Sequence, residues 1–333
     1  MTSLILHIGR PRTGTTSIQQ SLYHSRAFLR HHGILYPETG LHHGAHHQLG
    51  WGVSGQSITG WGKVPSFDSL LHKLANEVRS SKCENVIIST ESLVHNIKDA
   101  GNLDKKQRLE RLLALFSNVK VLCCARDQAR IIESSYCFQT VWEHTQQKAS
   151  FGDHVKNMTS LPGLNYSDIE DYYLDLDANV AFQFWSFSEA IASGNLVRRF
   201  FQVAGIEQAY RESVRVNESL SREATLAILE WNRAAKAGRR SRRSFVAWAR
   251  ATFPETGSSL YDVSLLADVI KTYKEANALL EKRTGIRFLD TPDPTAFASR
   301  CSGEKLLPHE LDRVHARIKR ADRWSLLRGR WGR

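Results

Sequence analysis

The sequence has no long hydrophobic run. Its first apolar run, Leu4 to Ile8, contains only five residues and is interrupted by His7, and no later segment approaches eighteen apolar residues. Membrane spans and the cores of signal peptides need longer runs than these. We therefore expect a protein without a transmembrane segment that remains cytoplasmic.

Cysteine is scarce, and its spacing matches no metal site. None of the five cysteines forms a CxxC pair, and two of them are adjacent inside a strand-like run; they are Cys83, Cys123, Cys124, Cys137 and Cys301. This spacing argues against a zinc site and a disulfide framework. We expect reduced, buried thiols.

Acidic residues are fewer than basic ones. The 333 residues include 34 Asp and Glu against 45 Lys and Arg, which gives a net charge of +11. Such a surface favours anions, and these include nucleotides, acidic glycans and nucleic acids. Much of the excess lies in the segment from Trp231 to Arg250, which has no acid, and in Arg313 to Arg333. These segments are interpreted either as solvated helical faces or as a docking surface for an anionic acceptor or a membrane.

Short apolar runs alternate with helical stretches in the first two thirds of the chain. Four runs are predicted strands: Ser3 to Ile8, Val86 to Ser89, Val119 to Ala125 and Val180 to Phe184. Strands separated in this way are typical of a parallel sheet that is covered on both faces. We predict an α/β fold with a doubly wound parallel sheet flanked by helices over residues 1–218. Residues 219–333 are predicted to form a helical C-terminal cap packed on this core.

A glycine-rich loop follows the first predicted strand. Its sequence, Gly9-Arg10-Pro11-Arg12-Thr13-Gly14-Thr15-Thr16, has the glycine spacing of a Walker A loop, which binds phosphate with backbone N–H groups and a helix N-terminus. Thr15 stands where the Walker lysine is expected, and the loop places a cation earlier, at Arg12. Three interpretations follow: a tight turn with a threonine N-cap, an NTPase-like binding loop, or a site for transfer of an anionic group.

The loop resembles the 5′-phosphosulfate loop of sulfotransferases that use 3′-phosphoadenosine 5′-phosphosulfate (PAPS). That family usually has Pro-Lys-[Ser/Thr]-Gly-Thr-Thr, and the chain has Arg12 in place of the lysine, as some bacterial members do. The resemblance implies a P-loop-type fold and transfer of a sulfuryl group, with PAP as the product. It also implies that Arg12, Thr13, Gly14, Thr15, Thr16 and Ser17 contact the nucleotide. Arg12 can stabilise charge, but unlike lysine it is not expected to act as an acid.

A second segment resembles the 3′-phosphate motif of the same family. Arg126 ends the third predicted strand, and Ser134 follows eight residues later, about two turns into a helix. On their own these residues are also consistent with a surface ion pair and an ordinary helical serine. Arg215 to Ser219 matches an Arg-x-Asn-x-Ser segment of bacterial members, which implies nucleotide contacts from Asn217 and Ser219. Alternatively, Ser219 only caps the next helix.

Sulfuryl transfer also needs a base that takes the proton of the acceptor. Glu91, just after the second predicted strand, and His47, in a glycine-rich and histidine-rich stretch, are the leading candidates, and His46 and Glu38 are further ones. Exposed histidines and a carboxylate at a helix N-terminus are the competing interpretations. We expect no metal, because no acidic strand end of the Walker B type is evident.

The expected function is sulfuryl transfer from PAPS to a hydroxyl or amine acceptor by in-line attack. The resemblance to bacterial members favours a carbohydrate or glycolipid as the acceptor, and a small molecule is also compatible. Two alternatives remain open. One is a P-loop kinase or NTPase, against which Thr15 argues, and the other is a nucleotide-binding or nucleic-acid-binding module without turnover. No recognisable nucleic-acid-binding motif supports a specific nucleic-acid partner.

Overall fold

The computed structural model describes residues 2–55, 65–94, 102–161, 163–176, 178–211, 220–234, 238–254, 257–288, 291–293 and 302–331. The chain divides into two compact units. The first comprises Met1–Asp127, Leu161–Asn217 and Tyr273–Asp290, and the second comprises Gln128–Ser160, Glu218–Thr272 and Thr291–Arg333. This division differs from the single boundary predicted near residue 218.

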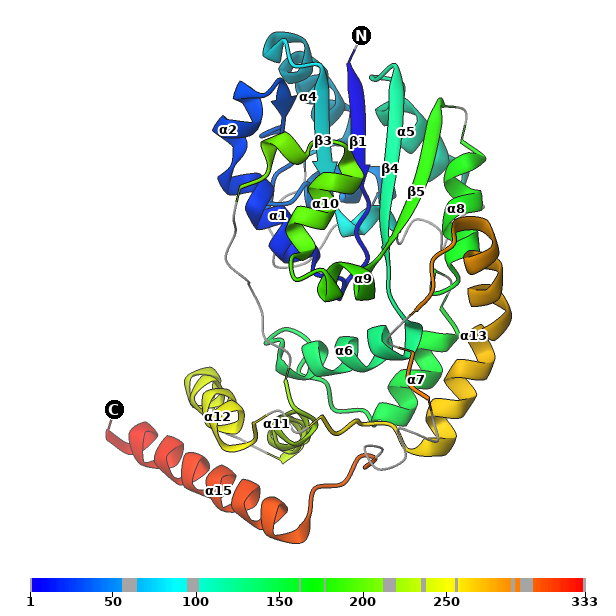
Figure 1. Ribbon diagram of the computed structural model, residues 1–333. Helices are drawn as coiled ribbons and strands as arrows, with labels where there is room; N and C mark the ends of the chain where they lie inside the picture. The colour runs from blue at the N-terminus through cyan, green and yellow to red at the C-terminus, as the bar shows by residue number, and fades with distance from the viewer. Residues whose placement is uncertain are drawn as a thin grey trace. The chain divides into compact units, whose positions relative to one another are not determined.

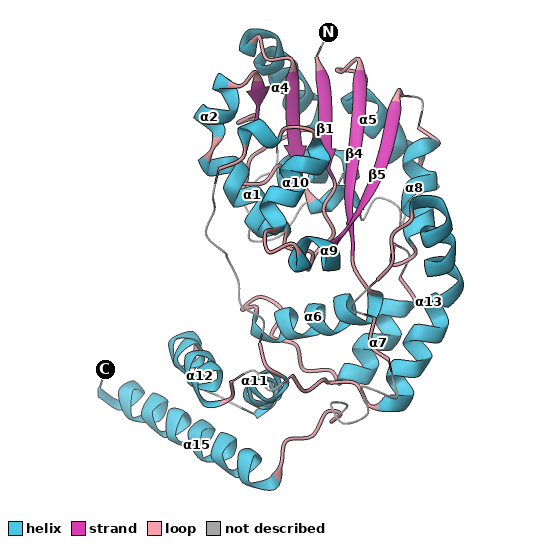
Figure 2. Ribbon diagram, viewed as in Figure 1, coloured by secondary structure: helices cyan, strands magenta, loops and turns pink. Residues whose placement is uncertain are grey.

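The first unit contains a parallel sheet, which confirms the α/β prediction. The strands are β1 (Ser3–His7), β2 (Ile34–Leu35), β3 (Asn85–Ser89), β4 (Asn118–Ala125) and β5 (Val180–Ser186). Their order is β2-β3-β1-β4-β5, and all described neighbours are parallel (Figure 2). Strand β1 is central, with Leu4 paired to Val86 on one side and to Val119 on the other. The chain therefore adds strands first on one side of β1 and then on the other, which makes the carboxyl end of β1 a topological switch point.

Helices cover both faces of this sheet. One face carries α1 (Thr15–His24), α2 (Arg26–His31), α9 (Phe187–Ala192) and α10 (Leu196–Ala204), and the other carries α4 (Phe67–Ser81) and α5 (Leu103–Leu113) (Figure 1). The unit also contains α3 (His47–Ser54), α8 (Tyr166–Leu174) and the last part of α13 (Val263–Thr284). Helix α4 begins where Ser66 caps it and has a single apolar stripe, Leu70, Leu74 and Val78, which is buried.

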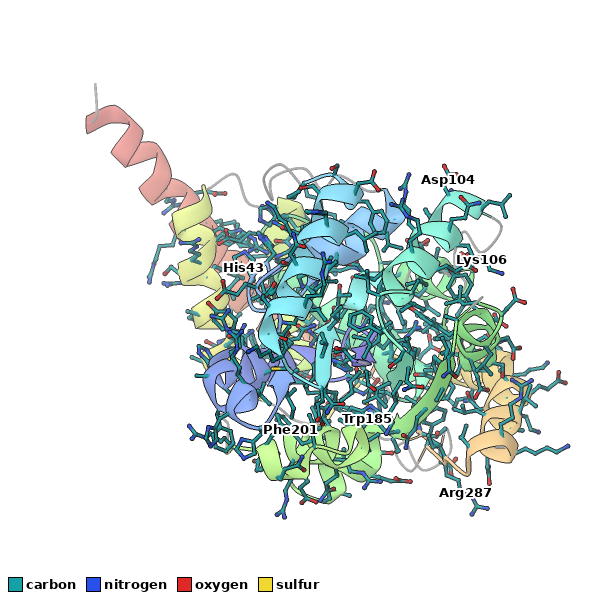
Figure 3. The ribbon with its side chains drawn as sticks, turned by 90° about the horizontal axis from the view of Figure 1, so that it is seen from above. His43, Asp104, Lys106, Trp185, Phe201 and Arg287 are labelled. Atoms are coloured by element: carbon teal, nitrogen blue, oxygen red, sulfur yellow. The ribbon has the colours of Figure 1, made fainter. Side chains whose placement is uncertain are left out.

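Alternate residues of the strands fill the two sides of the sheet. Ile5, Ile87 and Leu122 belong to one core cluster together with Ile18 and Leu22 of α1. Trp185 of β5 and Phe201 of α10 complete this cluster and lie close together in Figure 3. The same figure shows Asp104 and Lys106 on the outer side of α5, where Lys106 forms an ion pair with Asp175 at 2.8 Å.

The second unit is helical in its described part. It contains α6 (Gln128–Val141), α7 (Phe151–Thr159), α11 (Arg222–Ala234), α12 (Arg239–Thr252), the first part of α13 and α15 (Pro308–Trp331). Its core joins Trp231 of α11, Phe245 of α12 and Val314 of α15. Asn232 on α11 donates to the carbonyl of Thr140 on α6 at 2.8 Å, which explains why residues 128–160 belong with the C-terminal helices and not with the sheet.

Several basic residues of the arginine-rich segment have structural partners in this unit. Arg242 is buried and donates to the side chain of Asn232 and to the carbonyls of Thr140 and Val141. Arg243 pairs with Glu143 at 2.6 Å. The interpretation of the whole segment as a solvated face is therefore wrong for Arg242, which crosslinks α6, α11 and α12.

No helix among the described residues is both long and apolar enough to cross a membrane. The four cysteines in the described ranges are free thiols, and three of them, Cys83, Cys123 and Cys124, are buried. This agrees with the expected reduced state of those residues. Cys301 lies outside the described residues.

We predict that Arg242→Ala destabilises the protein by about 3 kcal/mol, because it leaves acceptors on α6 and α11 without their charged donor. Urea unfolding followed by circular dichroism measures this loss. Arg250→Ala on the same helix is the matched control, since Arg250 is exposed, and it should change the free energy of unfolding by less than about 0.5 kcal/mol. Equal effects of the two substitutions would contradict the structural role of Arg242.

Candidate functional site

Three neighbouring strands end at the same edge of the sheet, and each leads into a residue singled out by the sequence. The glycine-rich loop follows β1, Glu91 lies two residues after the end of β3, and Arg126 directly follows β4. Because β3 and β4 flank β1 in a parallel sheet, their carboxyl ends bring these residues to one region. Open α/β sheets bind their ligands at such an edge.

The loop after β1 is closely packed at its two glycines. A Cβ on Gly9 would lie 2.5 Å from Cγ2 of Thr15, and a Cβ on Gly14 would lie 2.0 Å from Cδ2 of Leu196. Gly14 also has φ +73 and directly precedes α1. The Thr13 hydroxyl donates to the carbonyl of Arg10 at 2.6 Å, so this side chain, expected to contact the nucleotide, holds the loop together here.

Arg12 has a left-handed backbone, with φ 74. Such a conformation is strained for a side chain with a Cβ and persists only where its surroundings hold it. The carbonyl oxygen of Arg12 accepts a hydrogen bond from NH1 of Arg126 at 2.6 Å. The arginines of the two expected phosphate motifs are therefore in direct contact.

Arg126 is fixed from several directions within the same unit. Its guanidinium lies over the ring of Phe187, with Cζ 4.5 Å from the ring centroid. Its backbone N–H donates to the hydroxyl of Tyr166 at 2.9 Å, and that hydroxyl donates in turn to the carbonyl of Arg126 at 2.5 Å. Sequence reasoning did not identify Phe187 or Tyr166, because neither belongs to a motif and both are distant from Arg126 along the chain.

Glu91 lies beside the start of α1. The hydroxyl of Thr15 donates to its Oε1 atom. Burial raises the pKa of Glu91 to about 7, while the positive charge of Arg12 opposes that rise. Glu91 therefore exchanges its proton close to neutral pH, as a general base requires, and it is in electrostatic contact with the loop arginine.

His47 also reaches this region, through the residue before Glu91. Its Nδ1 lies 3.5 Å from the hydroxyl oxygen of Thr90, and its ring stacks on Trp51. Burial, followed by the charges of His42 and His43, lowers the pKa of His47 to about 4. The imidazole is therefore neutral at pH 7, but it is a weak base there.

The two remaining base candidates have structural partners. Nε2 of the buried His46 donates to the carbonyl of Pro37 at 3.0 Å, and its Nδ1 accepts the N–H of Ser89 at 3.1 Å, so neither nitrogen is open to an acceptor. Glu38 is exposed and pairs with Arg26 at 3.1 Å. The structure thus favours Glu91 and His47 over His46 and Glu38.

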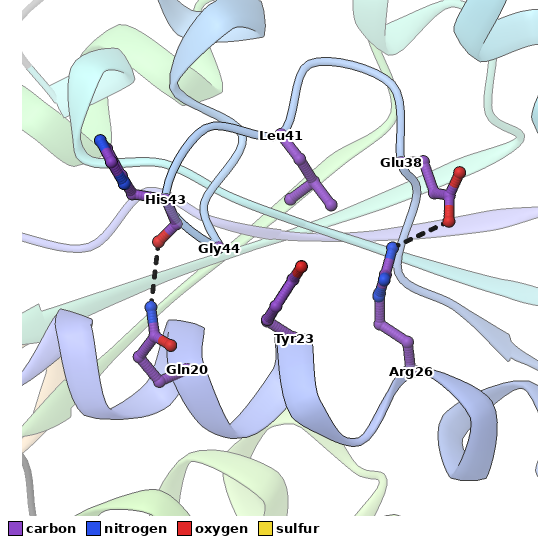
Figure 4. Close-up of a pocket in the computed structure, with 7 residues that line it drawn as sticks. All are labelled: Gln20, Tyr23, Arg26, Glu38, Leu41, His43 and Gly44. Carbon is purple, nitrogen blue, oxygen red and sulfur yellow. Dashed lines mark hydrogen bonds and ion pairs between the residues drawn. The ribbon is translucent and has the colours of Figure 1, made fainter.

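Glu38 and Arg26 belong instead to an open cavity of about 560 Å³ beside α1 (Figure 4). Its wall is mostly polar and aromatic: Gln20, Tyr23, Arg26, Glu38, Leu41, His43 and Gly44. The amide of Gln20 donates to the carbonyl of His43 at 3.0 Å, which ties the loop to the helix. The guanidinium of Arg26 lies 4.6 Å from the ring centroid of Tyr23.

For the other predicted nucleotide contacts the structure gives fewer interactions or none. Thr16 is exposed in the first turn of α1, and Ser17 is half-buried next to it with its N–H bonded to the carbonyl of Gly14. Ser134 lies on α6 and belongs to the second unit. Asn217 and Ser219 lie outside the described residues. Among the described residues, no three His, Cys, Asp or Glu side chains are grouped to hold a metal ion.

The left-handed backbone of Arg12 generates a stability prediction. We expect Arg12→Gly to be more stable than Arg12→Ala by about 1 kcal/mol, because glycine adopts a positive φ without strain. Thermal unfolding of the two variants measures this difference. The same pair at Ser17, inside α1, should give the opposite order. An alanine variant at residue 12 that is the more stable of its pair would show that the turn is not strained.

Comparisons of the chain with protein-family models, with curated proteins and with solved structures found no match. The site is consequently interpreted from its own chemistry. It has a glycine-rich loop at a topological switch point, a hydrogen bond from Arg126 to the carbonyl of Arg12 in that loop, and a carboxyl group, Glu91, with a pKa of about 7.

Proposed function

We propose that the protein is a sulfotransferase that moves the sulfuryl group of PAPS to a hydroxyl acceptor. The observation that carries the proposal is the contact between the two expected phosphate motifs, the hydrogen bond from Arg126 to the carbonyl of Arg12. Glu91 supports it, since its pKa of about 7 suits it to accept a proton beside the same loop. The resemblance of the loop to the 5′-phosphosulfate loop supplies the identity of the donor.

The nucleotide binds through backbone N–H groups of the loop and the start of α1, which suit phosphate and sulfate oxygens. Arg12 contributes a permanent charge beside the transferring group, and Arg126 contributes a second charge on the β4 side. Ser134, Asn217 and Ser219 remain predictions for the 3′-phosphate end of the nucleotide.

Transfer requires one bond to form and one to break. The acceptor oxygen attacks sulfur, and the bond between sulfur and the bridging oxygen of the 5′-phosphate breaks, so that PAP leaves with the bonding electron pair. Glu91 takes the proton of the acceptor. The Thr15 hydroxyl donates to Oε1 of Glu91, and we assign the acceptance of the proton to Oε2. Arg12 stabilises the charge on the sulfuryl oxygens as the bond breaks.

Glu91 is preferred to His47 as the base because of their proton affinities. A group with a pKa near the working pH accepts a proton more effectively than one with a pKa of about 4. His47 is assigned a positioning role, since it contacts Thr90, the residue before Glu91.

The acceptor is assigned to the polar cavity beside α1. An aromatic face on Tyr23 and hydrogen-bonding groups on Arg26 and Glu38 suit a molecule with several hydroxyls, such as a sugar. The chain runs from Glu38 in the wall of this cavity to His47 at the start of α3, so the cavity and His47 belong to neighbouring parts of the sequence.

Nucleotide binding is tested by thermal shift. PAP at one hundred times its dissociation constant should stabilise the protein by about 2.7 kcal/mol, whereas ATP with magnesium should stabilise it far less. Arg12→Met should abolish transfer from labelled PAPS, and Arg79→Met, an exposed arginine on α4, should leave it unchanged. Stabilisation by ATP with magnesium and not by PAP would replace the proposal with a kinase or NTPase.

The pH dependence of the rate tests the base. Because the pKa of Glu91 is raised to about 7, the carboxyl is protonated and inactive at pH 5, and kcat/KM should rise through pH 7 to a plateau. Glu91→Gln should lower kcat by about 100-fold or more and remove this limb. His47→Gln, the matched comparison, should keep the limb near pH 7. If the acid limb of the pH profile persists in Glu91→Gln but shifts in His47→Gln, then His47 is the base and Glu91 has the positioning role.

A further inference from the structure

A second arginine of the loop is buried without a hydrogen-bond partner for most of its head group. Arg10 is 6% exposed, and its Nε and NH1 atoms are shielded from solvent and make no hydrogen bond. No ion pair within the described residues involves it. Buried guanidinium groups almost always have a carboxylate or several carbonyl partners, because an unpaired buried charge is costly.

The described groups closest to Arg10 are an aromatic ring, a glycine and protonated side chains. Its Cζ lies 5.9 Å from the ring centroid of Tyr166, and a Cβ on Gly163 would lie 3.7 Å from its NH1. The titratable groups that its charge affects include Cys123 and Tyr273, and burial raises the pKa of each to about 12. Both stay protonated at neutral pH, so neither compensates the charge of Arg10.

Tyr273 adds a donor to this region. It lies on α13 in the part that belongs to the first unit, and its buried hydroxyl makes no hydrogen bond. The charge of Arg10 partly opposes the rise in the pKa of Tyr273 that burial causes, so the two groups interact electrostatically. Nε and NH1 of Arg10 and the hydroxyl of Tyr273 are therefore donors for which no acceptor is found among the described residues.

Arg10 lies near residues from both sides of the loop. A Cβ on Gly163 would lie 3.7 Å from NH1 of Arg10 and 3.9 Å from the carbonyl oxygen of Val94, which follows β3. The charge of Arg10 also acts on Cys123 of β4 and on Tyr166, whereas the charge of Arg12 acts on Glu91.

We propose that Arg10, with the hydroxyl of Tyr273 as a second donor, binds an oxyanion, a sulfate or phosphate group, beside the loop. The anion supplies the negative charge and the acceptor atoms that the described residues do not provide. The binding site is independent of sulfuryl transfer, since any oxyanion would satisfy it. Two sources share this chemistry: a phosphate of the nucleotide and a separate free or acceptor-borne anion.

Thermal shift with inorganic sulfate tests the site directly. Sodium sulfate, compared with sodium chloride at equal ionic strength, should stabilise the wild type with a saturable component. Arg10→Met should lose that component and keep only the general salting effect, with an apparent affinity for sulfate at least about tenfold weaker. Arg79→Met should respond as the wild type does. In chloride alone, Arg10→Met should melt at or above the wild-type temperature, because an uncompensated buried charge has been removed.

Tyr273→Phe provides a second test. This variant is expected to fold, since the substitution removes only a buried hydroxyl. It should weaken the saturable sulfate response by about tenfold. Sulfate responses of Arg10→Met and Tyr273→Phe equal to that of the wild type would overturn the proposal.

PAP and AMP distinguish the source of the anion. If Arg10→Met weakens PAP and leaves AMP unchanged, the anion is the 3′-phosphate. If it weakens neither while the sulfate response is lost, the anion is a separate one. Failure of PAP to bind the wild type would overturn the proposed sulfotransferase function, but a sulfate response lost in Arg10→Met would still support this site.

Discussion

The hydrogen bond from NH1 of Arg126 to the carbonyl of Arg12 is the contact on which the candidate site depends. It joins the residue after β4 to the loop after β1, and it holds a backbone turn with φ 74 that an arginine adopts only under constraint. Tyr166 fixes the backbone of Arg126 and Phe187 covers its guanidinium. The loop is thereby braced by neighbours that are themselves fixed, so that its arginine is positioned before any ligand binds.

The parallel sheet explains why cations and one acid gather here. Every described strand points the same way, so the residues after β1, β3 and β4 share an edge. A neighbouring positive charge favours the ionised form of a carboxyl, whereas burial favours its neutral form. At Glu91 burial outweighs the charge of Arg12, and the pKa is therefore raised to about 7.

The features that depend on local sequence patterns could be predicted from the sequence. Strands β1, β3, β4 and β5 were predicted from their apolar runs, whereas β2 was missed because Ile34–Leu35 is too short to show a pattern. The glycine loop and the arginine after β4 were likewise visible. The partners of these residues were not, because Arg126 bonds across 114 residues to Arg12 and across 40 to Tyr166. His46 shows the same limit: its residue type suggested a base, but contacts with Pro37 and Ser89 make it structural.

The electrostatic interaction between Arg12 and Glu91 couples donor binding to base strength under the proposed function. In the unliganded protein the Arg12 charge lowers the pKa of Glu91 and so makes the carboxylate less basic. A phosphosulfate on the loop brings negative charge next to Arg12 and offsets part of that effect, which raises the proton affinity of Glu91. The base therefore becomes stronger when the donor is in place, and the protonated acid that results is neutral beside the departing anion. A lysine at residue 12 would share this effect, but only arginine keeps its charge regardless of burial and so makes the coupling independent of its own titration.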